Sequence, residues 1–401
     1  MSNEYFIVLD ALRSDHVSHM PWLKSKINSS LYVENIQISS GFCERSEIFT
    51  GMSPRSSSFL NAFDYNFKNN LNRPYGWIKN WQAYFLTFFE KNDLAEKIIR
   101  RILWEISKKK SLTPFYSQRI PYKLLNKIVL TEDSVDFLEI SKKQKSGLLY
   151  FFTKKNYEID FSFFTSFQSD LKRTDFERLD YISKSQPKYN NKFIPIYIGL
   201  PDHIGHVYGP NSEEMIINLK NLDRSLEKFY LKCLSIDKNS SFSFLGDHGM
   251  EHVIDAIDIE KIINKISSEN NLQKGKDFYY FLDSTMLRIW WVKGKNNKID
   301  KFIKQFYNNN EVRAKGYLND DIDAVNEDIP EINNIADIVW WAKKGTIIFP
   351  NFFQNGVNNI KGMHGYLKRD SISSGFFLRT KKDLQPKYIS NFDIKKLDEL
   401  C

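Results

Sequence analysis

Cysteine is scarce in this chain, which has only three cysteines among its 401 residues: Cys43, Cys233 and Cys401. They form no CxxC pair, and their wide spacing does not suit a disulfide framework. The scarcity excludes a small secreted fold held together by disulfides, and it suits a reducing compartment.

Long apolar runs are missing as well. No run approaches the roughly 20 residues that a membrane-spanning helix requires. The chain begins Met-Ser-Asn-Glu and continues directly into a short apolar stretch, without the basic segment and apolar core of a signal peptide. We therefore expect a cytoplasmic protein without a transmembrane segment.

Basic and aromatic side chains, in contrast, are abundant. The formal net charge is +8, and 15% of the residues are aromatic. A hydrophobic content of 42% is typical of a folded globular protein and excludes a disordered one. The excess of basic residues favours anionic partners, such as phosphorylated substrates, nucleic acid or acidic membrane surfaces.

Three short apolar stretches, residues 5–9, 193–199 and 241–245, predict buried strands. Each is followed by acidic or histidine residues. In open α/β sheets, ligands bind at the carboxyl ends of the strands, so these polar residues are expected to meet at one edge of a sheet.

The first two strands are followed by residues that could bind a metal ion. Asp10 comes directly after the first strand, and Asp202 follows the second. His206 lies four residues after Asp202, a spacing that places both side chains on one side of a helical turn. A carboxylate oxygen and an imidazole nitrogen suit Zn²⁺.

The third strand is followed by a second acid–histidine pair, Asp247-His248, and His364 lies between glycines near the C-terminus. The chain has only seven histidines, and three of them stand in such glycine-flanked settings. Chance does not readily produce this clustering, so the residues predict a metal centre.

The order and spacing of these residues match a known pattern, which here comprises Asp10, Thr50-Gly51, the string "PDxxGHxYGP" from Pro201, the string "DHGM" from Asp247, and His364-Gly365. This set resembles the alkaline phosphatase superfamily, in particular its nucleotide pyrophosphatase/phosphodiesterase branch. The matching segments cover roughly residues 1–60, 195–255 and 360–370.

The resemblance implies an α/β fold with a mainly parallel central sheet flanked by helices. It also implies two divalent metal ions, usually zinc, and hydrolysis of a small anionic phosphate mono- or diester through a covalent phospho-enzyme. One ion would be held by Asp202, His206 and His364. The other would be held by Asp10, Asp247, His248 and the nucleophile.

The nucleophile is where the sequence departs from the family. Counting back from Thr50-Gly51, the expected position is Gly41, which has no side chain to attack with. Cys43 and Ser40 are the two candidates, and Cys43 is the preferred one. Arg45 is a candidate for binding a phosphate oxygen, with a salt bridge as the alternative. The string Cys43-Glu44-Arg45 lacks the sulfatase motif, so sulfatase activity is disfavoured.

The segments that match no known pattern predict insertions. We expect a metal-binding core from residues 1–74, 191–255 and 346–401, covered by a cap made of an aromatic and basic insertion, 75–190, and a second insertion, 256–345. The first insertion has no recognisable nucleic-acid-binding motif, so nucleic acid is disfavoured as a partner. Oligomeric state is open.

Other functions stay open beside hydrolysis. A phosphoryl or phosphoethanolamine transferase would pass the group to another alcohol, and a sugar-phosphate mutase is a third enzymatic possibility. A degenerate family member would keep the metal sites for structure or ligand binding, as the glycine at the expected nucleophile position suggests.

Overall fold

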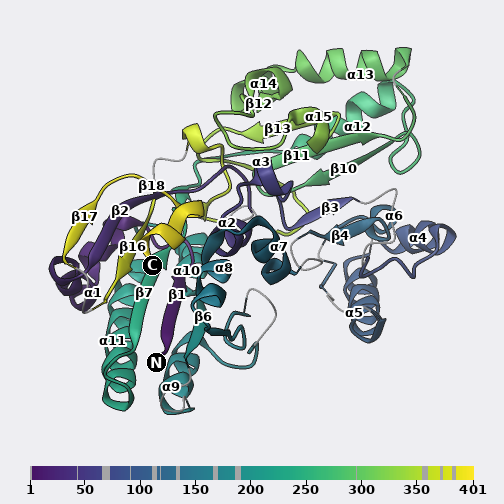
Figure 1. Ribbon diagram of the computed structural model, residues 1–401. Coiled ribbons are helices and arrows are strands. Elements are labelled where there is room, and N and C mark those ends of the chain that lie inside the picture. Colours follow the sequence, from purple (N-terminus) through teal and green to yellow (C-terminus); the bar gives the residue numbers. More distant parts are fainter. Residues whose placement is uncertain are drawn as a thin grey trace.

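The computed structural model describes most of the chain (Figure 1). The described residues are 2–42, 44–65, 73–90, 92–110, 115–117, 119–131, 136–165, 170–185, 191–294, 296–354, 360–370, 374–381 and 385–401.

A large sheet forms the centre of the lower lobe in Figure 1. Its strand order is β17-β2-β16-β7-β1-β6-β5, with β18 beside β2. All strands run parallel except β16, so the predicted mainly parallel sheet is confirmed. The strands are β1 (Glu4–Leu9), β2 (Leu31–Gln37), β5 (Glu158–Ile159), β6 (Lys192–Ile198), β7 (Ser241–Gly246), β16 (Gly375–Arg379), β17 (Lys387–Ile389) and β18 (Phe392–Asp393).

The central strand β1 is buried along its whole length. Its side chains alternate between the two faces of the sheet: Tyr5, Ile7 and Leu9 join one hydrophobic cluster, whereas Phe6 and Val8 join another. A parallel sheet covered on both faces requires such an unbroken apolar strand.

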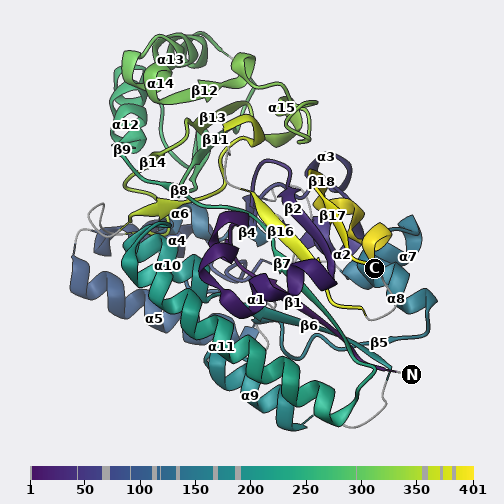
Figure 2. The same ribbon diagram turned by 90° about the vertical axis from the view of Figure 1, so that its left-hand side faces the viewer.

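Helices cover both faces of this sheet (Figure 2). One group of helices packs its apolar residues on the face that carries Tyr5, Ile7 and Leu9, and a second group packs on the face that carries Phe6 and Val8. The first group is α1 (Pro21–Lys26), α9 (Asp175–Ser185), α10 (Leu200–Tyr208) and α11 (Glu213–Ile236); the second is α2 (Glu44–Thr50), α7 (Phe137–Gln144), α8 (Gly147–Lys154) and the 3₁₀ helix η9 (Ile394–Leu400).

A smaller antiparallel sheet, ordered β10-β11-β13-β12, forms the upper lobe in Figure 1. It is formed within residues 278–342, part of the predicted second insertion. Its elements are β10 (Phe278–Leu282), β11 (Met286–Trp291), β12 (Gly316–Leu318), β13 (Ile338–Ala342), α12 (Ile259–Glu269), α13 (Asn297–Tyr307), α14 (Asn310–Lys315) and α15 (Ile332–Ile335).

The predicted first insertion, residues 75–190, divides between the two lobes. Its early part shares a hydrophobic cluster with the upper sheet, whereas α7, α8, β5 and α9 pack on or join the central sheet. The early part contains α4 (Asn80–Leu86), η3 (Thr87–Phe89), α5 (Asp93–Lys110), α6 (Tyr122–Leu125) and β4 (Ile128–Leu130), which pairs with β3 (Phe63–Tyr65).

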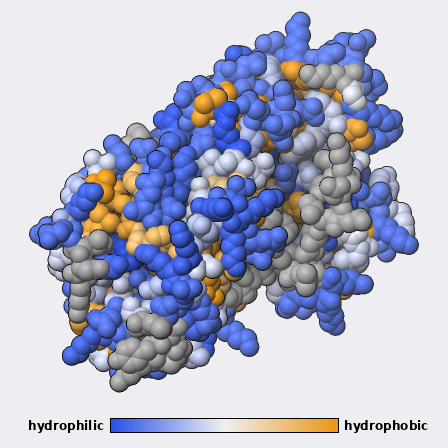
Figure 3. Space-filling model, in the orientation of Figure 1, coloured by the Kyte–Doolittle hydropathy of each residue, from blue (hydrophilic) through white to orange (hydrophobic). Residues whose placement is uncertain are grey.

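Short elements connect the lobes. Two of these are strand pairs: β9 (Asp255–Ile257) with β14 (Thr346–Ile348), and β8 (Glu251–His252) with β15 (Gly362–Met363). The short helix α3 (Pro54–Ser57) follows α2. None of the helices within the described ranges is long and apolar enough to cross a membrane. Hydrophilic residues cover most of the face in Figure 3.

A buried carboxylate fixes the turn that leads into α2. Glu47 accepts hydrogen bonds from the Ser39 hydroxyl (2.6 Å) and the Ser39 backbone N–H (3.1 Å). Burial raises the pKa of Glu47 to about 7; the Ser39 bonds and Lys395 oppose this rise, and Asp328 adds to it. Ionising Glu47 therefore lowers the stability of the folded state.

We expect this cost to appear in the pH dependence of stability. Because the pKa of Glu47 is higher in the folded state than in the unfolded chain, the free energy of unfolding falls as pH rises from about 4.5 to 7. E47Q removes this titration. Relative to wild type, E47Q should gain about 3 kcal/mol in unfolding free energy between pH 5 and pH 8.

Urea denaturation of both proteins at several pH values measures this gain. E139Q, which changes an exposed glutamate on α7, serves as the control and should follow the wild-type pH profile. Parallel profiles for E47Q and wild type would contradict the assignment.

Candidate metal centre

The three predicted strands end level with one another. Leu9 of β1 is paired with Ile198 of β6 and with Gly246 of β7. The residues that follow the strands, Asp10 and Asp247 directly and Asp202 one turn into α10, are therefore delivered to the same edge of the sheet.

Asp202, His206 and His364 form the first group. Their ligand atoms lie within 4.8 Å of one another. The Asp202 Oδ1 atom is 3.0 Å from His206 Nε2 and 3.4 Å from His364 Nε2. α10 supplies the first two residues at the predicted four-residue spacing, and the segment after β15 supplies the third.

Asp10, Asp247 and His248 form the second group, and all three are buried. His248 Nε2 lies 3.1 Å from Asp10 Oδ1 and 3.8 Å from Asp247 Oδ1. The other Asp10 oxygen accepts a hydrogen bond from the Tyr197 hydroxyl. Asp247 accepts the backbone N–H groups of Ala11 and His248, at 3.0 Å each.

The two groups adjoin. The rings of His248 and His364 are stacked with centroids 4.3 Å apart, and the centroids of His206 and His364 are 5.3 Å apart. The structure thus brings all six predicted metal ligands into one cluster.

Glu44 also belongs to this cluster, although the sequence motifs did not predict it. Its carboxylate groups with His248 and His364. The only sequence signal was its place directly beside the candidate Cys43.

The side chains fit a metal ion in their hydrogen bonding as well as in their chemistry. Nδ1 of His206 lies 2.8 Å from the Gly362 carbonyl, and Nδ1 of His248 lies 2.9 Å from the Gly249 carbonyl. When Nδ1 donates to a carbonyl, Nε2 carries the lone pair, the usual arrangement of a metal-binding histidine. Asp202 Oδ1 and Glu44 Oε1 are buried without hydrogen-bond partners.

Electrostatics within the cluster also call for a cation. Burial works against ionised Asp202, yet its pKa is lowered because His206 and His364 stabilise the carboxylate. Burial raises the pKa of Asp247 well above its usual value. For His248, burial would lower the pKa, but Asp247, Asp10 and Glu44 outweigh it and raise the pKa well above the ordinary value.

The candidate nucleophiles are placed less completely. The Ser40 hydroxyl donates to Glu327 Oε2 and accepts the Lys368 N–H, both at 2.7 Å, and neither partner belongs to the cluster. Cys43 lies outside the described residues, so the choice between the two stays a prediction. Arg45 lies on α2, half-buried, and its proposed phosphate contact also stays a prediction.

Gly41, the position at which the sequence pattern places the expected nucleophile, has no room for a side chain. Its φ is +113°, and a Cβ atom there would come within 2.4 Å of the Leu60 carbonyl oxygen. That carbonyl accepts the N–H of Phe42, whose ring in turn contacts His364. The departure from the family is therefore built into the backbone.

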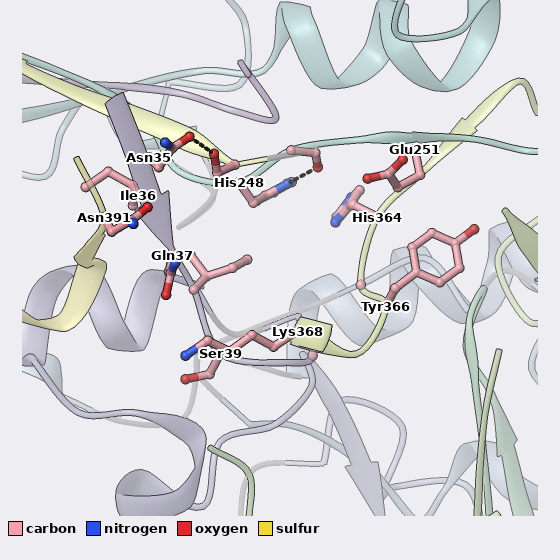
Figure 4. A pocket seen from close by; sticks show the side chains of 15 residues that line it. Asn35, Ile36, Gln37, Ser39, His248, Glu251, His364, Tyr366, Lys368 and Asn391 are labelled. Atoms are coloured by element: carbon pink, nitrogen blue, oxygen red, sulfur yellow. Dashed lines mark hydrogen bonds between the residues drawn. The ribbon is translucent and has the colours of Figure 1, made fainter. Parts of the chain in front are cut away.

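A cavity of about 430 Å³ opens beside the cluster. His248 and His364 form part of its wall, close to Glu251 (Figure 4). The remaining lining mixes apolar and polar residues, and the polar ones are Asn35, Gln37, Ser39, Lys368, Ser374 and Asn391.

Curated relatives match only parts of the chain. Venom phosphodiesterase 2 of Crotalus adamanteus is 28% identical over 218 residues, which cover 48% of this chain and 25% of the venom protein. GPI ethanolamine phosphate transferase 2 of Debaryomyces hansenii is 44% identical over 57 residues, covering 14% of this chain and 6% of the transferase. The chain therefore matches about a quarter or less of the length of these relatives.

Among solved structures, murine ectonucleotide pyrophosphatase/phosphodiesterase 5, in an inactive form in complex with AMP, superimposes with a TM-score of 0.64. It is 14% identical, and the match covers 100% of this chain and 94% of the murine chain. The human protein gives a TM-score of 0.62 at 14% identity, covering 99% and 92% of the two chains. These likenesses show the fold.

The sequence model of a family described as type I phosphodiesterase / nucleotide pyrophosphatase matches residues 6–367. This range contains every residue of the cluster described above. The protein therefore belongs to the type I phosphodiesterase / nucleotide pyrophosphatase family, the branch that the sequence motifs predicted.

Proposed function

We propose that the protein hydrolyses a small phosphate mono- or diester at a centre of two divalent metal ions, with zinc as the preferred metal. The observation that carries the proposal is the convergence of Asp10, Asp247 and His248 with Asp202, His206 and His364 at one sheet edge. Family membership supports the reaction class.

Each group would hold one ion. Each group offers three nitrogen or oxygen ligand atoms and leaves a further coordination position for water or substrate, as catalytic zinc sites do. When bound, two such ions supply a clamp on the phosphoryl oxygens and lower the pKa of the attacking group. Tyr197 holds Asp10 in place, and the carbonyls of Gly362 and Gly249 orient the His206 and His248 rings.

Cys43 is the proposed nucleophile. Both of its sequence neighbours touch the cluster: the Phe42 ring packs on His364, and Glu44 lies 3.9 Å from His248. In the first step the Cys43 sulfur would form a bond to phosphorus while the ester oxygen leaves and takes up a proton. Water would then break the S–P bond and restore the thiol, releasing phosphate from a monoester substrate or a phosphate monoester from a diester. Arg45 would bind a non-bridging oxygen.

A transferase is the second candidate. The local similarity to a GPI ethanolamine phosphate transferase supports it, because such an enzyme passes the group to an alcohol rather than to water. A degenerate member that only binds metal is supported by the closed backbone at Gly41. The predicted cytoplasmic location stays a prediction.

We expect the purified protein to hydrolyse p-nitrophenyl phosphate or bis(p-nitrophenyl) phosphate. Dialysis against EDTA should abolish turnover, and added Zn²⁺ should restore it, because the ions hold and polarise the phosphoryl group. C43A should lower kcat about a thousandfold or more. S40A should keep most of the activity if Ser40 acts only through its bonds to Glu327 and Lys368.

The p-nitrophenolate assay separates the alternatives. A transferase would release p-nitrophenolate slowly in water and faster when ethanolamine or glycerol is added. A metal-binding protein without catalytic function would bind zinc and release none with either ester. Turnover unaffected by EDTA would contradict the proposal.

A further inference from the structure

Glu44 stands at the junction of the two groups of metal ligands. It is the first residue of α2, and one of its carboxylate oxygens lies within 4.8 Å of ring nitrogens of His248 and His364. These two histidines belong to different groups in the predicted metal scheme. Glu44 therefore faces both proposed metal positions at once.

The Glu44 carboxylate lacks a partner within the protein where it meets the cluster. Its side chain is 14% exposed, and Oε1 is buried without a hydrogen bond. Oε1 lies 3.9 Å from His248 Nε2, which is longer than a hydrogen bond. Burying a carboxylate oxygen without a partner costs free energy. The position of Oε1 therefore indicates that it pairs with a bound group rather than with the protein chain.

The charge of the centre supports a role for Glu44. Two divalent ions carry four positive charges, and the six predicted ligands set three carboxylates against them. A fourth carboxylate at Glu44 adds negative charge beside the ions, which lowers the cost of burying them in an enclosed site.

We propose that Glu44 is a further metal ligand of this centre. This inference rests on the proposed two-metal function and adds a residue to it. Bound ions would then also hold the first residue of α2 in place.

Metal titration of the apoprotein tests the assignment without measuring activity. Zn²⁺ binding to wild type, E44Q and E44D is followed by calorimetry, and Co²⁺ binding by visible absorption. Wild type should bind two ions. E44Q should weaken the binding of at least one ion tenfold or more and alter the Co²⁺ spectrum, since ligand-shell changes typically have effects of this size. E44D should lie between the two.

E251Q is the matched control. Glu251 lies near His364 in the adjoining cavity but pairs with Lys344 at 3.2 Å, so E251Q should bind both ions as wild type does. If E44Q and E44D bind two ions with wild-type affinity and spectrum, Glu44 is not a ligand although the proposed function stands. If wild type binds no ions, the proposed function itself fails.

A separate observation concerns the early part of the first insertion, on the right in Figure 1. Trp81, Tyr84, Phe85 and Phe88 are 56–69% exposed. They recur at the spacing of one helical face, and Ala83 on the other side is buried. We call these four residues the aromatic face.

The following helix, α5, adds apolar and basic groups. Leu94, Ile98 and Ile102 recur every four residues and are 52–70% exposed. Lys97 and Arg101 are exposed on the same helix. Residues 79–110 contain eight Lys or Arg and four Asp or Glu, so the segment has a net positive charge.

We propose that the aromatic face binds the surface of an anionic lipid bilayer. Exposed Trp, Tyr and Phe beside basic residues are typical of helices that lie in the membrane interface, where the rings enter the headgroup region and the cations meet lipid phosphates. The net positive charge of the segment complements such a surface and favours it over a neutral protein partner.

Cosedimentation with vesicles of equal parts phosphatidylcholine and phosphatidylserine tests this proposal. Wild type should pellet with them, less so at high salt and with vesicles of phosphatidylcholine alone. The triple variant W81A/F85A/F88A should stay in the supernatant. I217A/L231A, which removes two exposed apolar residues of α11, should pellet as wild type does.

Either of two results would overturn the membrane assignment. One is a triple variant that pellets like wild type. The other is a wild-type protein that ignores anionic vesicles but forms a concentration-dependent dimer that the triple variant lacks, which would assign the face to a second copy of the chain. Circular dichroism of each variant confirms that it is folded.

Discussion

The concentration of negative charge at one sheet edge is the constraint on which the site depends. Carboxylates of Asp10, Asp247 and Glu44 converge on His248, and burial adds to their mutual repulsion. A protein does not gather buried acids without a compensating positive charge. The strands β1, β6 and β7 end level with one another. The register of the parallel sheet therefore determines which side chains meet at this edge.

The sequence predicted the sheet and six cluster residues because each depends on local pattern. An apolar strand followed by Asp or His shows both the strand and its functional end, as at Leu9-Asp10. Glu44 was missed because its direction depends on how the chain enters α2. That entry is set by long-range contacts, such as the N–H of Phe42 with the Leu60 carbonyl, which no local pattern reveals.

The division of the first insertion could not be read from composition either. Residues 75–190 are similarly aromatic throughout, but which face each helix buries is decided by its partners. Phe152 stacks on Phe193 of the central sheet, whereas Tyr122 joins the core of the upper lobe. The same aromatic residues therefore serve two different hydrophobic cores.

His364 shows what the meeting of the lobes means for the site. Its neighbours Met363 and Tyr366 are buried in the core of the upper lobe, while its ring faces residues of the central sheet edge. An ion bound to both would cross-link His364 to Asp202 and His206, residues that stand on opposite sides of the upper sheet in the sequence. Metal binding would then fasten the upper lobe to the edge of the central sheet.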